Sequence, residues 1–512
     1  MAMSGNRLQI FFIFCTTFLL AISPLAAAID PPGRIGRISL TGESTQLRIG
    51  DNVASGNAAL NWPVTTGALI ETARGDRTEV RIGATSLRID GGTSLEFAEL
   101  SDERIWLRLS QGSVILAIQN PEHAAGMTLD TPEGRLRLDS AGAYRADVAG
   151  GTTAFSAYSG SARIENLGLA VRSGDRILLL GGKDHRFLLG QAASDGFSQW
   201  AFARERQDAG SIRYVSSEMT GHEELDRHGT WQMAAEYGTA WFPQGMPSGW
   251  APYRWGRWAW IPPWGWTWID QSPWGFAPFH YGRWVLIGGN WAWLPGTYAT
   301  RPVYAPALVA WSGRPGRKPS FSFGTAPAPG WFPLGPREAY HPAYRASPRY
   351  MNSINAGHVP HATGNPTESA PGETERHIHR DSLEAASVVP QRAVQAGSAP
   401  YRFTAPFDNT LRSGTFVTPP PPAALEHKSH RSIPVDRPIT ARPAEPPAPA
   451  SQKAPLPAMG VNAAPQSPTM SLPKEARGTP GPPVQAALRQ PAAESLHVRP
   501  QGRNGDSRHH RM

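Results

Sequence analysis

Hydrophobic and polar residues alternate with a period of two over much of the chain, which is the pattern of half-buried β-strands. Between residues 33 and 183 the alternating stretches are short, and turns containing Gly, Asp, Asn or Pro separate them. We therefore predict an all-β module over residues 29–185. Its predicted strands are Ile38–Leu40, Thr45–Ile49, Glu79–Ile82, Ser86–Ile89, Ser94–Phe97, Ile105–Leu109, Ser113–Ile118, Gly134–Leu138, Ala143–Val148, Thr153–Tyr158, Ser161–Ile164 and Asp175–Leu180.

Tryptophan marks a second β region. Fifteen of the 18 tryptophans lie between Trp231 and Trp331, and many recur at every second position. That spacing is typical of a strand with one aromatic face, so we predict a Trp-rich sheet module over residues 229–350. The predicted architecture is thus mainly β, with two β modules.

An internal repeat with an offset of 26 residues lies inside the Trp-rich module. Residues 251–258 (APYRWGRW) return as residues 277–284 (APFHYGRW). In each copy the Arg-Trp strand leads through a Pro-Pro or Gly-Gly turn into a second Trp-rich strand. The repeat predicts two consecutive antiparallel β-hairpins.

The number of clustered rings suggests a binding surface. A Trp side chain can bury about 150–250 Å², and a module of this size has a modest interior. We expect about two thirds of the rings to form core and cross-strand pairs and the rest to form an exposed strip; the simpler alternative is that all of them are core. The repeat arginines should face away from the neighbouring rings, where they can stack on other rings or contact acids. The candidate ligand-binding residues are Trp258, Trp260, Trp266, Trp268, Trp284, Trp291, Trp293, Arg257 and Arg283.

Catalytic and metal-binding patterns are weak. Glu236 and Asp270 are the only acids between Trp231 and Trp331, which disfavours a pair of catalytic carboxylates. No nucleophile-elbow, Walker or His-Glu-x-x-His motif occurs. We predict no enzymatic activity, no cofactor and no metal. Two sets of metal-type side chains are interpreted as a solvated turn (Glu218, His222, Glu223, Glu224, Asp226, His228) and as parts of a disordered region (His377, His379, His509, His510).

Two further segments complete the predicted organisation. Residues 186–228 form a linker in which one helix follows Asp195. Residues 351–512 contain 22 prolines between Pro400 and Pro500 and no tryptophan, so we predict a disordered, Pro/Ala-rich basic tail.

The N-terminus predicts export. Arg7, the apolar run from Leu8 to Ile22 and the small residues 26–28 form a signal-peptide pattern over residues 1–28. The alternative is an uncleaved anchor. Since Cys15 is the only cysteine, cleavage would leave a mature chain without a thiol. A periplasmic or envelope location follows. The net charge of +8 suits an acidic surface, and the tail is a candidate for peripheral contact with acidic membrane or polymer.

Two resemblances refine this picture. Residues 83–89, 109–114, 131–134, 158–164 and 171–175 carry Gly-turn and Thr-Pro-x-Gly phrases that resemble the periplasmic domain of FecR-type proteins. Residues 214–231, 237–243, both hairpins and residues 330–340 resemble an uncharacterised family of exported bacterial Trp- and Pro-rich proteins. The first resemblance implies a β domain and envelope signalling; the second implies no known activity.

We expect a non-catalytic binding or scaffold protein of the cell envelope. Its expected partners are an envelope polysaccharide, peptidoglycan or an envelope protein, and no specific nucleic acid. The alternative is a FecR-like regulator or sensor that lacks a cytoplasmic domain of its own.

Overall fold

The computed structural model describes residues 30–50, 54–182, 186–206, 211–312, 322–323, 326–327 and 330–359, together with residues 377–380, 382, 384–389, 394, 396–398 and 400. These residues form a mainly β protein, as the sequence predicts. The predicted export signal and the predicted tail beyond residue 400 lie outside the described residues.

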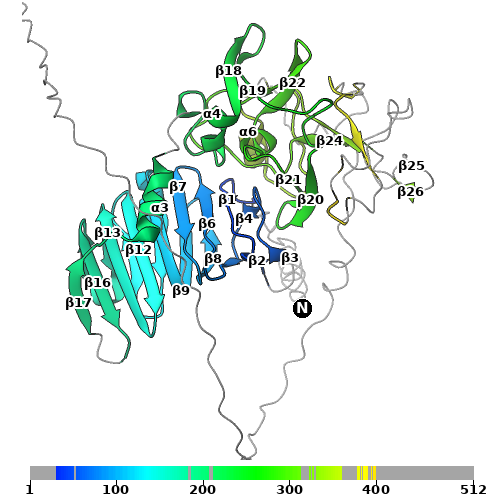
Figure 1. Ribbon diagram of the computed structural model, residues 1–512. Helices are drawn as coiled ribbons and strands as arrows, with labels where there is room; N and C mark the ends of the chain where they lie inside the picture. Colours follow the sequence, from blue (N-terminus) through cyan, green and yellow to red (C-terminus); the bar gives the residue numbers. More distant parts are fainter. Residues whose placement is uncertain are drawn as a thin grey trace, which may run out of the picture. The chain divides into compact units, whose positions relative to one another are not determined.

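The first β module consists of two sheets that share their longest strand, β9 (Ile105–Ile118) (Figure 1). Sheet 1 has the order β4 (Pro63–Val64), β1 (Gly36–Leu40), β6 (Thr78–Ile82), β7 (Thr85–Ile89), β9, β12 (Gly142–Ala149), β13 (Thr152–Ser159), β16 (Asp175–Leu180) and β17 (Phe187–Gln191). Sheet 2 has the order β3 (Ala54–Asn57), β2 (Gln46–Ile49), β5 (Ala68–Glu71), β8 (Ser94–Leu100), β9, β10 (Met127–Asp130), β11 (Arg135–Leu138), β14 (Ser161–Ile164) and β15 (Leu169–Arg172). The pairing of β9 with β10 is parallel and the others are antiparallel. Short helices α2 (Pro121–Gly126) and η1 (Glu165–Leu167) join strands.

Strand β9 passes from sheet 2 to sheet 1 at Gly112. Its backbone there has φ +88°, and a Cβ would lie 2.4 Å from the Cα of Thr93, so glycine alone fits without a shift. The alternation of buried residues changes by one position across this glycine. The residues that belong to the common core of the module are Ile105, Leu107 and Leu109 before it and Val114, Leu116 and Ile118 after it.

Both sheets bury one apolar face in a common core. Val80 of sheet 1 and Ile70 of sheet 2 are both fully buried in it. All predicted strands of this module coincide with observed ones, although two of them form the single strand β9. Strands β3, β4, β5, β10, β15 and β17 were not predicted.

The connecting segment contains the helix predicted after Asp195. Helix α3 (Gly196–Glu205) is capped by the Asp195 carboxylate, which accepts from the Ser198 amide at 2.9 Å. Phe197 and Ala201 pack on Ile115. The next turns are η2 (Ser211–Arg213), η3 (His222–Glu224) and α4 (Leu225–His228).

The interpretation of residues 218–228 as a solvated turn is wrong for its central residues, although Asp226 is exposed. His222, Glu223 and Glu224 are buried. The reason is distant in sequence: Arg37 of β1 places Nη1 2.7 Å from Glu223 Oε1 and compensates its charge inside the protein.

The Trp-rich segment forms both predicted hairpins. The first pairs β20 (Gly256–Ile261) with β21 (Gly265–Asp270), and the second pairs β22 (Arg283–Ile287) with β23 (Asn290–Leu294). The short helix α5 (Ala277–His280) lies between them. The second hairpin joins β19 (Gly238–Pro243) and β18 (Gly229–Ala234) in a four-stranded sheet. The first hairpin is a two-stranded sheet of its own.

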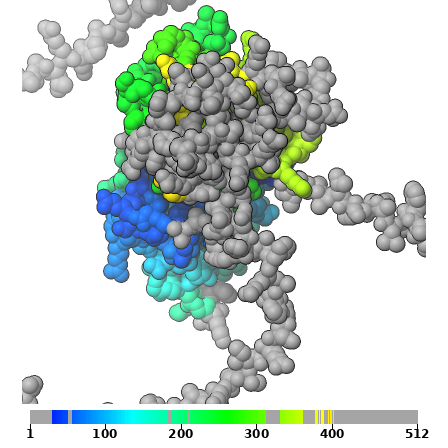
Figure 2. Space-filling model, turned by 90° about the vertical axis from the view of Figure 1, so that its right-hand side faces the viewer, coloured from blue at the N-terminus to red at the C-terminus, as the bar shows by residue number. Residues whose placement is uncertain are grey.

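Residues beyond Tyr350 continue the packed structure, so the prediction that the tail begins at residue 351 is wrong for the part that is described. Strand β28 (Ser387–Val388) pairs with β27 (Gly330–Pro333), which pairs with β24 (Val309–Ser312). Helix α6 (Pro348–Asn355) and the short strands β25 (Ser322–Phe323) and β26 (Ala326–Pro327) complete the described elements. Figure 2 shows residues of the 377–400 stretch, in yellow, against the Trp-rich segment, in green.

The predicted boundary at residue 351 is too early because this stretch carries apolar residues before the proline-rich composition begins. Ala385, Val389 and Val394 belong to the hydrophobic cluster of the clustered tryptophans, which we call the aromatic core. Within the described residues, no helix has the length and apolar character needed to cross a membrane.

Candidate functional site

Eleven of the 15 clustered tryptophans are buried, so most of the aromatic surface is core. The predicted exposed strip is wrong for six of its seven rings, because rings from distant segments cover them. Trp258, for example, lies 5.3 Å from Trp331 and 4.5 Å from Trp311 between ring centroids. Trp260 is half-buried. The buried candidates, each 7% exposed or less, are Trp258, Trp266, Trp268, Trp284, Trp291 and Trp293.

The two repeat arginines lie in different environments. Arg283 is 1% exposed and donates to the carbonyls of Glu338 and Gly282 and to Asn355 Oδ1, at 2.8–3.0 Å. Burial lowers its pKa to about 10. The expectation that Arg283 is free to contact a ligand is therefore wrong, since backbone and side-chain acceptors in the interior already bind its guanidinium.

Arg257 is half-buried, and its guanidinium lies over the ring of Trp62, 5.4 Å from the ring centroid. No described residue provides it with a carboxylate or a hydrogen-bond acceptor. Burial lowers the pKa of Arg257, and no neighbouring acid opposes this. Arg257 thus carries a partly desolvated charge, and its one specific contact with a described residue is an aromatic face.

A groove of about 460 Å³ lies beside Arg257. Three segments line it: the first β module, strand β20 and the stretch after residue 394. The Nε1 groups of Trp62 and Trp258 are buried and have no acceptor among the described residues. Because these two nitrogens are buried, what the groove itself offers is a positive charge and a flat aromatic surface. Its lining residues are Leu47, Gly56, Asn57, Trp62, Arg257, Trp258, Ala259, Ala396 and Gly397.

A buried polar joint holds Trp62 in place against Arg257. The neighbouring Asn61 is fully buried with φ 63°, a conformation that asparagine tolerates better than most residues. Its Nδ2 donates to the carbonyls of Asp270 and Ser272 at 2.9 and 2.7 Å, and its Oδ1 accepts from Arg37 Nε at 2.9 Å. These bonds connect the loop that carries Trp62 to the end of the hairpin that carries Arg257.

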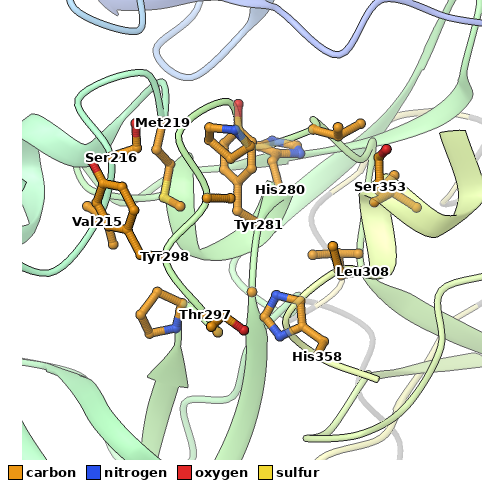
Figure 3. A pocket seen from close by; sticks show the side chains of 18 of the residues that line it. Val215, Ser216, Met219, His280, Tyr281, Thr297, Tyr298, Leu308, Ser353 and His358 are labelled. Carbon is orange, nitrogen blue, oxygen red and sulfur yellow. The ribbon is translucent and has the colours of Figure 1, made fainter. Parts of the chain in front are cut away.

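Two other hollows fit a ligand less well. A depression of about 430 Å³ includes Arg77, but Asp90 pairs with that arginine at 2.9 Å. A small cavity of about 40 Å³ lies beside His280 and His358 (Figure 3). Burial lowers the pKa of both histidines to about 3, so they are neutral. That volume holds water rather than a ligand of drug size.

The other histidines and acids that the sequence analysis considered do not form a site. His377 and His379 are buried: His377 Nδ1 lies 3.0 Å from Glu338, and His379 Nε2 lies 2.9 Å from the Trp284 carbonyl. Their assignment to a disordered region is therefore wrong. Glu236 lies in an exposed turn, whereas Asp270 is buried at the end of β21, accepting from Trp268 Nε1 at 3.0 Å. Among the described residues, no group of three or more His, Cys, Asp or Glu is arranged to hold a metal.

The Trp-rich segment matches a known protein family. Residues 222–338 match a family of unknown function, DUF6600. The DUF6600 match lies within the region that resembles exported Trp- and Pro-rich proteins, and it contains both hairpins and both repeat arginines. No curated protein matches the chain.

Two crystal structures of a proposed anti-sigma factor from Parabacteroides distasonis ATCC 8503, at 2.50 and 1.65 Å resolution, are also similar. They share 13% and 12% identity with this chain, at a TM-score of 0.23. The alignments cover 26% of this chain and 63% and 64% of the other, just under two thirds of its length.

Sequence reasoning missed Trp62 and Asn61. The available signal was modest: Trp62 is one of three tryptophans outside the cluster. Nothing in the sequence indicates that this ring meets Arg257, which lies in a different module.

Proposed function

We propose that this protein is a non-catalytic binding protein of the cell envelope and that its groove at Arg257 and Trp62 recognises an acidic, oxygen-rich polymer. The observation that carries the proposal is the guanidinium of Arg257, which lies against an aromatic face at a groove and has no acidic partner among the described residues. The volume of about 460 Å³ falls within the range of small-ligand sites, roughly 300–1,000 Å³.

The chemistry of the groove selects for an anion. A carboxylate or phosphate can accept two parallel N–H bonds from a guanidinium, and such charge-assisted bonds are stronger than neutral ones. The exposed part of the Trp62 ring offers a flat surface to the apolar face of a sugar. Acidic glycans present both features within one or two units. The overall charge of +8 favours the approach of such a polymer.

An envelope location rests on the signal-peptide pattern of residues 1–28, with an uncleaved anchor as the alternative. Either arrangement would hold the groove outside the cytoplasm, where acidic polysaccharides and peptidoglycan are found.

Binding of the purified chain to isolated peptidoglycan sacculi and to alginate, with dextran as a neutral polymer, tests the proposal. Retention on at least one acidic polymer, weak retention on dextran and a decrease with added salt are expected. Arg257→Ala should lower the affinity at least about tenfold, the loss of one charge-assisted bond. Trp62→Ala should lower it as well.

Arg163→Ala is the matched control because it removes the same charge from an exposed side chain of β14. It should leave binding nearly unchanged. Equal losses for Arg163→Ala and Arg257→Ala would show that net charge alone causes retention. No retention on any acidic polymer would overturn the proposal and leave an envelope protein as the expected partner.

A further inference from the structure

Strand β17 (Phe187–Gln191) is a sheet edge that no other described strand covers. It pairs with β16 on one side, and Figure 1 shows it as the outermost strand of sheet 1. All five of its residues are exposed, including Phe187 at 40%, Leu188 at 57% and Leu189 at 74%. Natural sheets usually protect such an edge with a charge, a proline or a covering segment. The strand FLLGQ contains neither a charge nor a proline.

The free backbone groups of β17 can be assigned. The carbonyl of Arg186 accepts a hydrogen bond from the Leu180 amide at 2.9 Å, and the Ala192 amide donates to the Gly174 carbonyl at 2.8 Å. The backbone groups of Arg186 and Ala192 therefore point toward β16. Alternation along an antiparallel strand then directs the N–H and C=O groups of Phe187, Leu189 and Gln191 toward the open edge.

The apolar side chains of β17 are also only partly covered. Ile177 and Leu179 of β16 are each 2% exposed in the core, and they stand opposite Leu189 and Phe187. Phe187 and Leu189 therefore extend the core face of sheet 1 into solvent. Apolar residues on this face are stabilised only when another surface covers them.

We propose that β17 pairs with β17 of a second copy of this chain, antiparallel and centred on Leu189, to form one continuous sheet across a two-fold axis. In this register Phe187 stands opposite the partner's Gln191 and Leu189 opposite the partner's Leu189. Every outward N–H and C=O of the strand then has a partner. Leu188 stands opposite the partner's Gly190, which leaves room for it.

The neutral strand β17 is a surface at which two copies can meet without local charge repulsion. Two copies that each carry a net charge of +8 repel one another, so a contact between them requires a surface without like charges. The five residues of β17 are neutral, and this register places no charged pair opposite another within the strand.

Sedimentation velocity of the full chain tests the proposal. The unmodified protein should show a monomer–dimer equilibrium at concentrations up to about 100 µM. Leu189→Lys places two cations opposite each other and should weaken the dimer at least about tenfold. Met233→Lys is the control, since Met233 is 78% exposed in β18 and lies outside the proposed contact. It should leave the equilibrium unchanged.

A crosslink tests the register. Leu189→Cys in a chain whose remaining cysteine is Cys15 should give a dimer with a short bismaleimide, whereas Met233→Cys should not. A chain that stays monomeric at 100 µM, or equal crosslinking of the two variants, would overturn the proposal. So would slow amide exchange of Leu189 in a monomer, because it would show that another segment of the same chain covers the edge.

Discussion

Glu223 and Arg37 form an ion pair of 2.7 Å inside the protein, with their side chains 3% and 0% exposed. The pair joins η3 to β1, next to the polar joint that positions Trp62. Burial raises the pKa of Glu223, but the charges of Arg37, Arg81 and His222 together outweigh burial, and the pKa is lowered. The pair therefore helps to hold the segments that build the groove.

Glu223→Gln should destabilise the protein by about 3–5 kcal/mol, because it leaves a buried arginine without its counter-charge. Since the folded pKa of Glu223 is depressed, the contribution of the pair is present above the pKa of the unfolded chain and is lost as the pH falls through the folded value. Denaturant unfolding at pH 7 and at pH 3 measures both effects. Glu236→Gln, in an exposed turn, should change the unfolding free energy by less than about 0.5 kcal/mol; equal effects of the two variants would contradict the assignment.

Replacing the two repeat arginines should separate stability from binding. Arg283→Ala leaves the acceptors Gly282, Glu338 and Asn355 without their donor and opens a cavity, so we expect a loss of about 3–5 kcal/mol. Arg257→Ala removes no hydrogen bond that the structure shows, and its cost should be about 1 kcal/mol or less. Thermal and denaturant unfolding provide the comparison. A loss above about 3 kcal/mol for Arg257→Ala would show that this arginine is structural.

The aromatic pairs of the first hairpin make a second matched comparison. Trp268 is fully buried against Trp258, with ring centroids 5.3 Å apart, whereas Trp260 is half-buried against Trp266. Trp268→Ala should cost about 3–5 kcal/mol, and Trp260→Ala roughly half as much or less. The unfolding free energies of the two variants are compared, provided that both variants keep the β-sheet circular dichroism signal of the original chain. Equal costs would mean that the half-buried ring of Trp260 is energetically part of the core.

Alternation of hydrophobic residues was sufficient to predict most strands, because a residue's neighbours two positions away share its face of the sheet. The repeat was sufficient to predict both hairpins, since its turns and strand lengths are local features. Neither pattern could predict which face would be covered. Trp258 is buried by Trp311 and Trp331, and Arg283 is bound by Asn355, all of which lie far along the chain.

The groove at Arg257 and Trp62 could not be predicted from the sequence for the same reason. Arg257 was a candidate because of its place in the repeat, but its partner ring, Trp62, belongs to the first β module and lies far away in the sequence. Contacts between modules depend on how their surfaces fit, and Asn61 fixes that fit through carbonyls rather than through a recognisable side-chain pattern.

Asp270 should make stability depend on pH in a specific window. Burial raises its pKa to about 7, despite the bonds from the Ser272 amide and Trp268 Nε1 that favour the charged form. Between about pH 4 and pH 7 the folded chain then holds a proton that the unfolded chain releases, so the stability contributed by Asp270 falls as the pH rises through this range, by roughly 4 kcal/mol.

Asp270→Asn removes this titration. The difference in unfolding free energy between the variant and the original chain should shift in favour of the variant from pH 4 to pH 7. A difference that stays constant over this range would show that Asp270 ionises normally.

Ile35 and Val394 belong to the same aromatic core, although they lie near opposite ends of the described chain. During synthesis the hairpins leave the ribosome long before Val394 does. The tryptophan rings of the hairpins therefore lack some of their packing partners until the segment around Val394 has been synthesised. Contacts of such long sequence separation are entropically slow to form. The nascent chain therefore exposes tryptophan surface for the time needed to add the last hundred or so residues of this core, and we expect chaperone dependence to be concentrated in that interval.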